Sequence, residues 1–145
     1  MTNDTDLSLG RRVMAMVEDL ARHTDEAGRL TRLYLSPAHR AAADTTLAFM
    51  RAAGLLAHID ALGSVVGRLD GADPSAPALL IGSHIDSVVD AGRYDGNLGV
   101  VLGIVVAEAL RSEGIVPSCP IEVLAFGDEE NVRFPTNLST SYALA

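Results

Sequence analysis

Cysteine is almost absent from the chain, since Cys119 is its only one. A single thiol cannot form an internal disulfide, and it cannot supply the set of thiolates that a structural zinc cluster needs. Cys119 directly precedes Pro120, and we interpret it as a structural residue without chemistry of its own. The shortage of cysteine favours a protein of the reducing cytoplasm.

Positive charge and long apolar runs are also scarce. The 11 Lys and Arg residues are outnumbered by 19 Asp and Glu residues, which gives a formal net charge of −8. This balance argues against binding to nucleic acid or an anionic membrane, and it favours small molecules or cations as partners. The longest apolar run, LGVVLGIVVAEAL, contains Glu108 and is too short for a membrane span. The first twelve residues lack the apolar core of a signal peptide.

The composition indicates one domain that begins with two helices. The 145 residues, 48% of them hydrophobic, suffice for a single core but not for two comfortable ones. Apolar residues at helical spacing predict a first helix over residues 10–22. A second helix over residues 36–54 should begin after the cap Ser36, with Pro37 in its first turn, and stop at Gly54. The segment between the two helices is expected to be a loop.

The rest of the chain alternates between strands and a helix. Residues 55–71 alternate and break near Gly63, which predicts two strands, and residues 78–85 form an apolar run typical of a strand covered on both faces. An apolar helix is expected over residues 99–114, and another buried strand over residues 121–127. A strand, a helix and a strand in succession indicate a right-handed crossover between parallel strands. The predicted fold class is α/β, with a mixed sheet flanked by helices.

Two acidic clusters follow the predicted parallel strands. His84 and Asp86 come at the end of the 78–85 strand, in the stretch GSHIDSVVDAGRYDGNLGV, and the triplet DEE at 128–130 follows the 121–127 strand. Ligands of such sheets gather beyond the carboxyl ends of the strands, so both clusters should meet in one crevice. Carboxylates beside apolar strands are costly unless a cation compensates their charge. The sequence therefore predicts a bound cation at this edge of the sheet.

The spacing of these residues suggests how a metal could be held. On an extended backbone His84 and Asp86 point to the same face, where the carboxylate can accept an N–H from the imidazole and leave the other ring nitrogen free for a metal. Asp95 lies between Gly92 and Gly96, in a turn that can bring its carboxylate back toward His84. The two oxygens of Asp95 could then bridge two cations.

The adjacent residues Glu129 and Glu130 should diverge, so that one can be a ligand and the other a base for the attacking water. A histidine at a strand end is often merely hydrogen-bonded, and a DEE triplet is often a solvated turn. Their joint occurrence, with Asp95 between them, favours a hydrolytic site with two divalent ions, zinc or manganese. The remaining histidines lack a carboxylate at a useful spacing and are interpreted as surface or packing residues: His23, His39 and His58.

These motifs resemble a known family. GSHIDSVVDAGRYDGNLGVV and EVLAFGDEENVRFPTNLSTSYALA resemble the metal-dependent amidase/hydantoinase/carbamoylase family of aminoacylase-like zinc exopeptidases. The similarity is greatest to allantoate amidohydrolases and N-carbamoyl-L-amino-acid hydrolases. The segments GRLTRLYLSPAHRAAADTTLAFMRAAGL and DALGSVVGRLDG are similar too, so the match covers about residues 10–145. The resemblance implies hydrolysis of a ureido or carbamoyl C–N bond.

The resemblance also implies a role for each site residue. Matched by position, His84 would be a ligand of one ion, Asp95 the bridge between two ions, and Glu130 a ligand of the other. Glu129 would be the general base and acid, and Asp86 would orient His84. Allantoate or an N-carbamoyl-L-amino acid would be the substrate, and ammonia would leave. The complete protein is expected to be a homodimer that binds neither nucleic acid nor membrane.

The chain departs from the family pattern within its motifs and at its end. Asn131 stands where a Gly commonly follows the Glu pair, Ser64 stands where an Asn is usual, and LSTSYALA replaces a Gly-Ser turn. Family members continue with two more histidine ligands, an inserted domain and substrate-binding arginines. Residues 1–145 are therefore interpreted as the N-terminal part of the catalytic domain, without a second domain and inactive alone. The alternatives are an aminoacylase or peptidase of the same superfamily and a truncated metal-binding fragment without catalysis.

Overall fold

The computed structural model describes residues 4–135 and 138–144. Helix α1 (Asp4–Ala21) begins before the predicted residue 10. Helix α2 (Pro37–Ala52) begins as predicted, because the Ser36 side chain accepts a hydrogen bond from the His39 N–H at 3.1 Å and Pro37 occupies the first turn. The helix is followed by Gly54 with φ of 84°, a left-handed conformation that glycine adopts readily.

Four strands form one mixed sheet in the order β1-β2-β4-β3. Strand β1 (Leu56–Ile59) pairs antiparallel with β2 (Val65–Leu69), and β2 pairs antiparallel with β4 (Ile121–Phe126). Strand β3 (Leu79–His84) pairs parallel with β4. The predicted mixed sheet is confirmed, including its parallel pair.

Helix α3 (Asn97–Ser112) connects the two parallel strands and packs closely on them. Gly99 and Gly103, one turn apart, face the sheet. A Cβ at Gly99 would lie 2.7 Å from the side chain of Ser83, and one at Gly103 would lie 3.1 Å from those of Ile81 and Val123. These glycines therefore let the helix backbone approach the strands.

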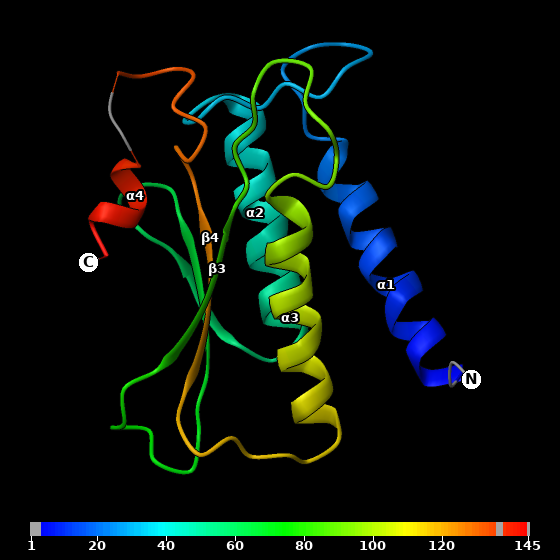
Figure 1. Ribbon diagram of the computed structural model, residues 1–145, viewed down its shortest axis with the longest axis vertical. Helices are drawn as coiled ribbons and strands as arrows, with labels where there is room; N and C mark the ends of the chain where they lie inside the picture. Colours follow the sequence, from blue (N-terminus) through cyan, green and yellow to red (C-terminus); the bar gives the residue numbers. More distant parts are fainter. Residues whose placement is uncertain (1–3, 136–137, 145) are drawn as a thin grey trace.

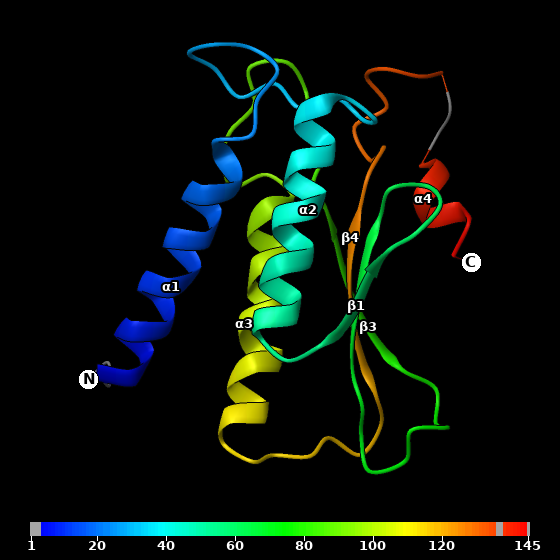
Figure 2. The same ribbon diagram turned by 180° about the vertical axis from the view of Figure 1, so that it is seen from behind.

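The helices cover one face of the sheet (Figures 1 and 2). Helices α2 and α3 lie directly on that face, and α1 lies outside them, packed mainly against α3. The core forms between these layers and includes Val17, Leu20, Met50, Ile104 and Val123. Over the opposite face, the described residues place only the short helix α4 (Ser139–Tyr142), near the carboxyl end of β4.

The prediction that residues 78–85 form a strand covered on both faces is wrong for this chain. Strand β3 is an edge strand, and its Leu79 and Leu80 side chains are 54% and 51% exposed. An apolar run reports the character of the side chains, whereas their coverage depends on the elements that pack against them. Here β4 is the only described strand that pairs with β3. Helices α1, α2 and α3 cover a single face, and α4 lies over the other face only near the carboxyl end of β4.

The structure also bears on the expected absence of a membrane span and on Cys119. In the described ranges, no helix is long and apolar enough to cross a membrane. Cys119 is a free, half-buried cysteine in the loop before β4. It precedes β4, whereas the DEE triplet follows that strand, so β4 separates the two. Its interpretation as a structural residue stays a prediction.

Candidate metal centre

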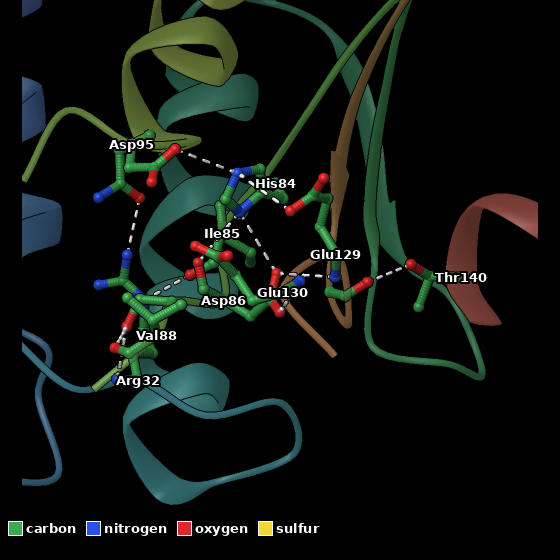
Figure 3. Close-up of polar contacts among 12 residues, drawn as sticks. Arg32, His84, Ile85, Asp86, Val88, Asp95, Glu129, Glu130 and Thr140 are labelled. Carbon is green, nitrogen blue, oxygen red and sulfur yellow. Dashed lines mark hydrogen bonds and ion pairs between the residues drawn. The ribbon is translucent and has the colours of Figure 1, made fainter. Parts of the chain in front are cut away.

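His84 occupies the last position of β3, where it lies beside Asp86. The residue is only 9% exposed. Its Nδ1 lies 3.1 Å from the main-chain carbonyl oxygen of Asp86 and 3.4 Å from the Asp86 carboxylate oxygen Oδ1. The imidazole is therefore held on its Nδ1 side, and Nε2 faces the other acidic residues (Figure 3).

Asp95 lies near His84 because the main chain of the turn packs directly against the histidine at Gly96. Gly96 has φ of 64°, and a Cβ there would lie 2.4 Å from the carbonyl oxygen of His84 and 2.6 Å from its imidazole ring. Only glycine fits such a conformation at such a distance. The turn brings Oδ1 of Asp95 to 3.5 Å from Nε2 of His84.

Asp86 also holds the second acidic cluster in place. Its carboxylate accepts hydrogen bonds from the main-chain N–H of Glu129 at 3.2 Å and of Glu130 at 3.1 Å. The preceding Asp128 has φ of 58°, and its side chain accepts a hydrogen bond from the Ser139 hydroxyl at 2.6 Å. The chain after β4 is thus turned back toward the end of β3, with Thr140 donating a hydrogen bond to the carbonyl of Gly127 on the far side.

The predicted site residues all come together. One ligand atom from each of His84, Asp95 and Glu130 lies within 4.8 Å of the other two. Glu129 points to the same place, with Oε2 3.8 Å from His84 Nε2, while its side chain remains 49% exposed. The two adjacent glutamates therefore diverge: Glu130 groups with His84 and Asp95 in a triad, and Glu129 lies at the solvent side of this triad. Their roles as ligand and base stay predictions.

The triad and its neighbours carry several carboxylates whose negative charge a bound cation would compensate. Burial raises the pKa of Glu130, and the carboxylates of Asp95, Asp86 and Glu129 raise it further against the effect of His84. Burial alone would lower the pKa of His84, but the Asp86 and Glu129 carboxylates outweigh it and raise the pKa to about 9. In the described structure, the buried Oε1 of Glu130 has no hydrogen-bond partner.

This donor set fits a divalent metal ion. A buried carboxylate oxygen without a partner is costly, and a cation would compensate it. One imidazole nitrogen with carboxylate oxygens is a ligand combination that suits zinc or manganese. His84, Asp95 and Glu130 could be ligands of such ions, and Asp86 holds the imidazole from its Nδ1 side. Burial raises the pKa of Asp86, but the hydrogen bonds from His84 and the two main-chain amides lower it overall, so its carboxylate stays charged.

The remaining histidines have the packing and surface roles that were predicted. His39 is 2% exposed and packs edge-on against Tyr34, with ring centroids 5.3 Å apart. Burial lowers the pKa of His39 to about 4, so its ring is neutral near pH 7. His23 lies 2.7 Å from the hydroxyl of Thr45 through its Nε2, and His58 is exposed on β1.

The structure shows the surroundings of all three departures from the family pattern. Asn131 has φ of 55°, in the left-handed region where glycine is favoured and asparagine is the best-tolerated substitute. This conformation explains how Asn replaces Gly directly after the Glu pair. Ser64 is buried, and its hydroxyl has no hydrogen-bond partner among residues 4–135 and 138–144. Leu138, at the start of the segment that replaces the Gly-Ser turn, also has a positive φ, 53°.

One buried residue beside the site was not predicted from the sequence. Arg32 is completely buried beside the ligand-bearing segments, although it belongs to a stretch that was expected to be a loop. No local motif separates it from the neighbouring Arg29, which is half-exposed and pairs with Glu26. Two of its hydrogen-bond acceptors, Ile85 and Asn97, lie more than 50 residues away along the chain, and only the folded structure reveals them.

A comparison with protein families identifies the class. A model of Peptidase family M28 matches residues 64–144, which is more than half of the chain. That span contains all five of the predicted site residues. The chain therefore belongs to Peptidase family M28.

The names of individual relatives describe a deiminase and an amidohydrolase. The chain is 46% identical over 134 residues to allantoate deiminase 1 of Glycine max, covering 91% of this chain and 28% of that protein. It is 43% identical over 119 residues to the N-carbamoyl-L-amino acid amidohydrolase of Geobacillus stearothermophilus, covering 82% of this chain and 29% of that protein. The chain thus spans less than a third of the length of these relatives. The predicted resemblance to the amidase/hydantoinase/carbamoylase group is confirmed.

Solved structures agree on the fold. A hydantoinase/carbamoylase family amidase from Burkholderia ambifaria superposes with a TM-score of 0.85 at 36% identity, covering 91% of this chain and 33% of the other. A structure from Bacteroides vulgatus whose name describes a zinc-dependent exopeptidase superposes with a TM-score of 0.64 at 16% identity, which shows the fold alone. The chain has the α/β fold of zinc-exopeptidase-like amidases.

Proposed function

We propose that this chain supplies part of the active site of a dinuclear metal-dependent amidohydrolase that cleaves a ureido or carbamoyl C–N bond. The observation that carries the proposal is the convergence of His84, Asp95 and Glu130, with a buried Glu130 oxygen that lacks a protein partner among the described residues. The names of the relatives support the reaction class: allantoate deiminase and N-carbamoyl-L-amino acid amidohydrolase both act on bonds of this kind. Allantoate or an N-carbamoyl-L-amino acid is the proposed substrate.

Each residue has a separate part in the proposed reaction. His84 would be a ligand of one ion, Glu130 a ligand of the other, and Asp95 a ligand of both. When bound, divalent ions supply a Lewis acid that polarises the substrate carbonyl and stabilises the charge that develops on its oxygen. Asp86 keeps the His84 ring in one orientation, since both its carboxylate and its carbonyl oxygen lie within 3.4 Å of Nδ1.

Glu129 is the proposed general base and acid. Its side chain reaches the triad, with Oε2 3.8 Å from His84 Nε2, and yet is 49% exposed, so it can contact both a water molecule and a substrate. It would take a proton from the attacking water and then deliver that proton to the leaving nitrogen. Ammonia would depart, and a carbamoyl group would also release carbon dioxide. Proton transfer of this kind commonly contributes about 10²–10⁴-fold to the rate.

We expect the 145-residue chain alone to bind metal ions but not to catalyse hydrolysis. A catalytic zinc normally has three protein ligands. The residues assigned here would give each ion two, with Asp95 counted for both. We therefore propose that the 145-residue chain hydrolyses neither allantoate nor N-carbamoyl amino acids, and that the complete protein, a proposed homodimer, supplies the missing ligands and substrate contacts.

A chimeric enzyme tests the proposed function. The matching 119 residues of the Geobacillus stearothermophilus amidohydrolase would be replaced by the corresponding residues of this chain, and release of ammonia from N-carbamoyl-L-amino acids and allantoate would be measured with added Mn²⁺ or Zn²⁺. The proposal expects activity that requires the metal and disappears in the Glu129→Gln chimera. A folded, metal-loaded chimera whose activity does not change on Glu129→Gln would contradict it.

Cleavage of a peptide or N-acyl bond is the second candidate. The specific observation that favours it is the match of residues 64–144 to a peptidase family. The same chimera separates the candidates, because dipeptides and N-acetyl amino acids can be assayed beside the carbamoyl substrates. Preferential cleavage of these compounds would replace the carbamoyl proposal while leaving the assigned metal ligands unchanged.

A further inference from the structure

Arg32 is a completely buried guanidinium in the loop between α1 and α2. Its Nε donates a hydrogen bond to the carbonyl of Ile85 at 2.5 Å, and its Nη2 donates one to Oδ1 of Asn97 at 2.7 Å. Its Nη1 donates to the carbonyl oxygens of Leu20 at 2.7 Å and His23 at 3.1 Å. All four acceptors are uncharged, and they use four of the five N–H groups of the side chain.

Burying this charge is costly. A charged group that leaves water needs compensation, and hydrogen bonds to neutral oxygens return only part of the lost solvation. Burial lowers the pKa of Arg32 to about 10, with Asp86 and Asp25 acting in the opposite direction, so the guanidinium remains charged at neutral pH. Its position relative to the proposed metal centre indicates a function for this buried charge.

The first connection leads to the His84 segment. Ile85, whose carbonyl oxygen accepts from Arg32, lies between His84 and Asp86. The main chain of Arg32 strengthens this link, because its N–H donates to the Ser87 hydroxyl at 2.8 Å and its carbonyl accepts from the Ser87 N–H at 2.9 Å. Arg32 therefore holds the chain on both sides of Asp86.

The second connection leads to the Asp95 turn. Asn97 accepts from Arg32 through Oδ1 and donates through Nδ2 to the carbonyl of Arg93 at 3.1 Å. Arg93 and Asn97 flank Asp95 at either end of the turn. The amide of Asn97 is 1% exposed, so water does not compete for these hydrogen bonds. The Arg32 side chain thus reaches the turn that carries the proposed bridging carboxylate.

We infer that Arg32 is a positioning residue that fixes the His84 segment and the Asp95 turn relative to each other, so that their ligand atoms are in place before a metal ion arrives. In Figure 3 the guanidinium lies between these two segments and contacts neither His84 nor Asp95 directly. The inference rests on the proposed function, since it assigns Arg32 to the same metal centre. It extends the centre to a residue outside its motifs.

The affinity of the chain for Mn²⁺ tests this inference. In Arg32→Lys the charge is kept, but a single ammonium group cannot reach four acceptors on separate segments. Loss of such a supporting contact commonly weakens metal binding by about 10–100-fold, and we expect a loss in this range. Met50→Ala is the matched control, because Met50 is fully buried where α2 packs on β2. It should lower the melting temperature and leave the affinity for Mn²⁺ unchanged.

Amide hydrogen exchange provides a readout that needs no metal. Arg32→Lys should lower the protection of residues 85–87 and 93–97 together, while Met50→Ala should not affect these segments selectively. Asn97→Ala is a milder second variant that removes only the link to the Asp95 turn. Asn97→Ala should weaken Mn²⁺ binding by less than Arg32→Lys does. If Arg32→Lys fails to fold, Asn97→Ala is the variant that tests the inference.

The outcomes separate this inference from the proposed function. Equal affinity for Mn²⁺ in the unmodified chain, Arg32→Lys and Asn97→Ala would overturn the inference, and so would an equal loss of affinity in Met50→Ala. If the unmodified chain binds neither Mn²⁺ nor Zn²⁺, the proposed metal centre fails instead. Hydrogen exchange then still decides whether Arg32 ties the two segments together, and unchanged protection in Arg32→Lys would show that it does not.

Discussion

The buried and the exposed members of the proposed metal centre are held in different ways. Asp86 is 3% exposed and accepts hydrogen bonds from two main-chain amides, and Arg32 is completely buried with four acceptors. The side chains of Asp95 and Glu129, in contrast, are 62% and 49% exposed and are placed mainly by the backbone that carries them. Of the proposed ligands, His84 and the Oε1 of Glu130 therefore belong to the buried half of the site, whereas the proposed bridge Asp95 and the proposed base Glu129 face solvent.

The largest expected effect comes from an exposed residue. In the chimeric enzyme, Glu129→Gln should lower kcat by about 10²–10⁴-fold, because an amide of nearly the same size cannot take a proton from water. The variant should retain its metal content and its stability. The measurement is turnover beside metal analysis of the same sample.

Glu130→Gln is the matched variant for Glu129→Gln, since the two residues are adjacent and the substitution is the same. A neutral ligand holds a cation less well, so this variant should lose metal, and excess metal should partly restore its activity. If Glu129→Gln loses metal while Glu130→Gln keeps it, the roles assigned to the two residues are inverted.

A buried residue should affect metal binding and stability together. In Asp86→Asn one carboxylate oxygen becomes an NH₂ group, so the side chain can accept only one of the two hydrogen bonds from the N–H groups of Glu129 and Glu130. We expect metal binding to weaken by about 10–100-fold and the free energy of unfolding of the metal-free chain to fall by about 1–3 kcal/mol. Asp95→Asn, at the exposed side, should weaken metal binding without lowering that free energy. Denaturant unfolding and calorimetry of both variants decide whether the two halves differ in this way.

Metal affinity should rise with pH. The neighbouring carboxylates overcome the effect of burial and raise the pKa of His84 to about 9, so near neutral pH the imidazole must release its proton to become a ligand. The affinity for Zn²⁺ should therefore increase by up to about tenfold per pH unit below the pKa. Calorimetry in buffers of different ionisation enthalpy measures the released proton. Binding without proton release near neutral pH would show that His84 is not a ligand.

The same raised pKa affects the stability of the metal-free chain in the opposite direction. Protonated His84 is favoured in the folded state, because its folded pKa of about 9 exceeds the ordinary value of 6.5. This stabilising contribution is complete below pH 6.5 and is lost as the pH rises toward 9. Metal affinity and metal-free stability should consequently change in opposite directions over this range, as pH-dependent titration and unfolding would show.

The smallest expected effect concerns the backbone that aims the glutamates. Asn131 donates a hydrogen bond from Nδ2 to the carbonyl of Glu129 at 2.8 Å and accepts one from the Leu138 N–H at 3.0 Å. Asn131→Ala and Asn131→Gly both lose these bonds, but only alanine is strained at φ of 55°. The alanine variant should be less stable than the glycine variant by about 1–2 kcal/mol. Equal stability in thermal unfolding would show that the left-handed conformation is not maintained.

Much of the fold and the central site could be predicted from local patterns. The parallel strands have apolar runs that end in polar residues, and strands that run parallel bring their carboxyl ends to one edge of the sheet. His84, Asp95 and Glu130 therefore had to lie near one another once these strands were recognised. The glycine at position 96 was a correct sign that the Asp95 turn approaches His84 closely.

Features that depend on distant parts of the chain could not be predicted. The exposure of Leu79 and Leu80 depends on which elements cover β3, and an apolar run does not contain that information. Arg32 acquires its position through Ile85 and Asn97, which are 53 and 65 residues away, and nothing in its neighbours indicates burial of a charge. Arg32, which supports the site, was therefore harder to predict than the proposed ligands.

The most direct test of the metal centre is a calorimetric titration of this chain with Zn²⁺. It would compare the unmodified chain, Glu130→Gln, and the control Glu122→Gln, whose carboxylate lies on β4 and pairs with Arg68 at 2.8 Å. We predict saturable binding to the unmodified chain, equal binding to Glu122→Gln, and binding weakened by at least about tenfold in Glu130→Gln. Indistinguishable isotherms for all three proteins, or no saturable binding to the unmodified chain, would contradict the assignment of His84, Asp95 and Glu130 as metal ligands.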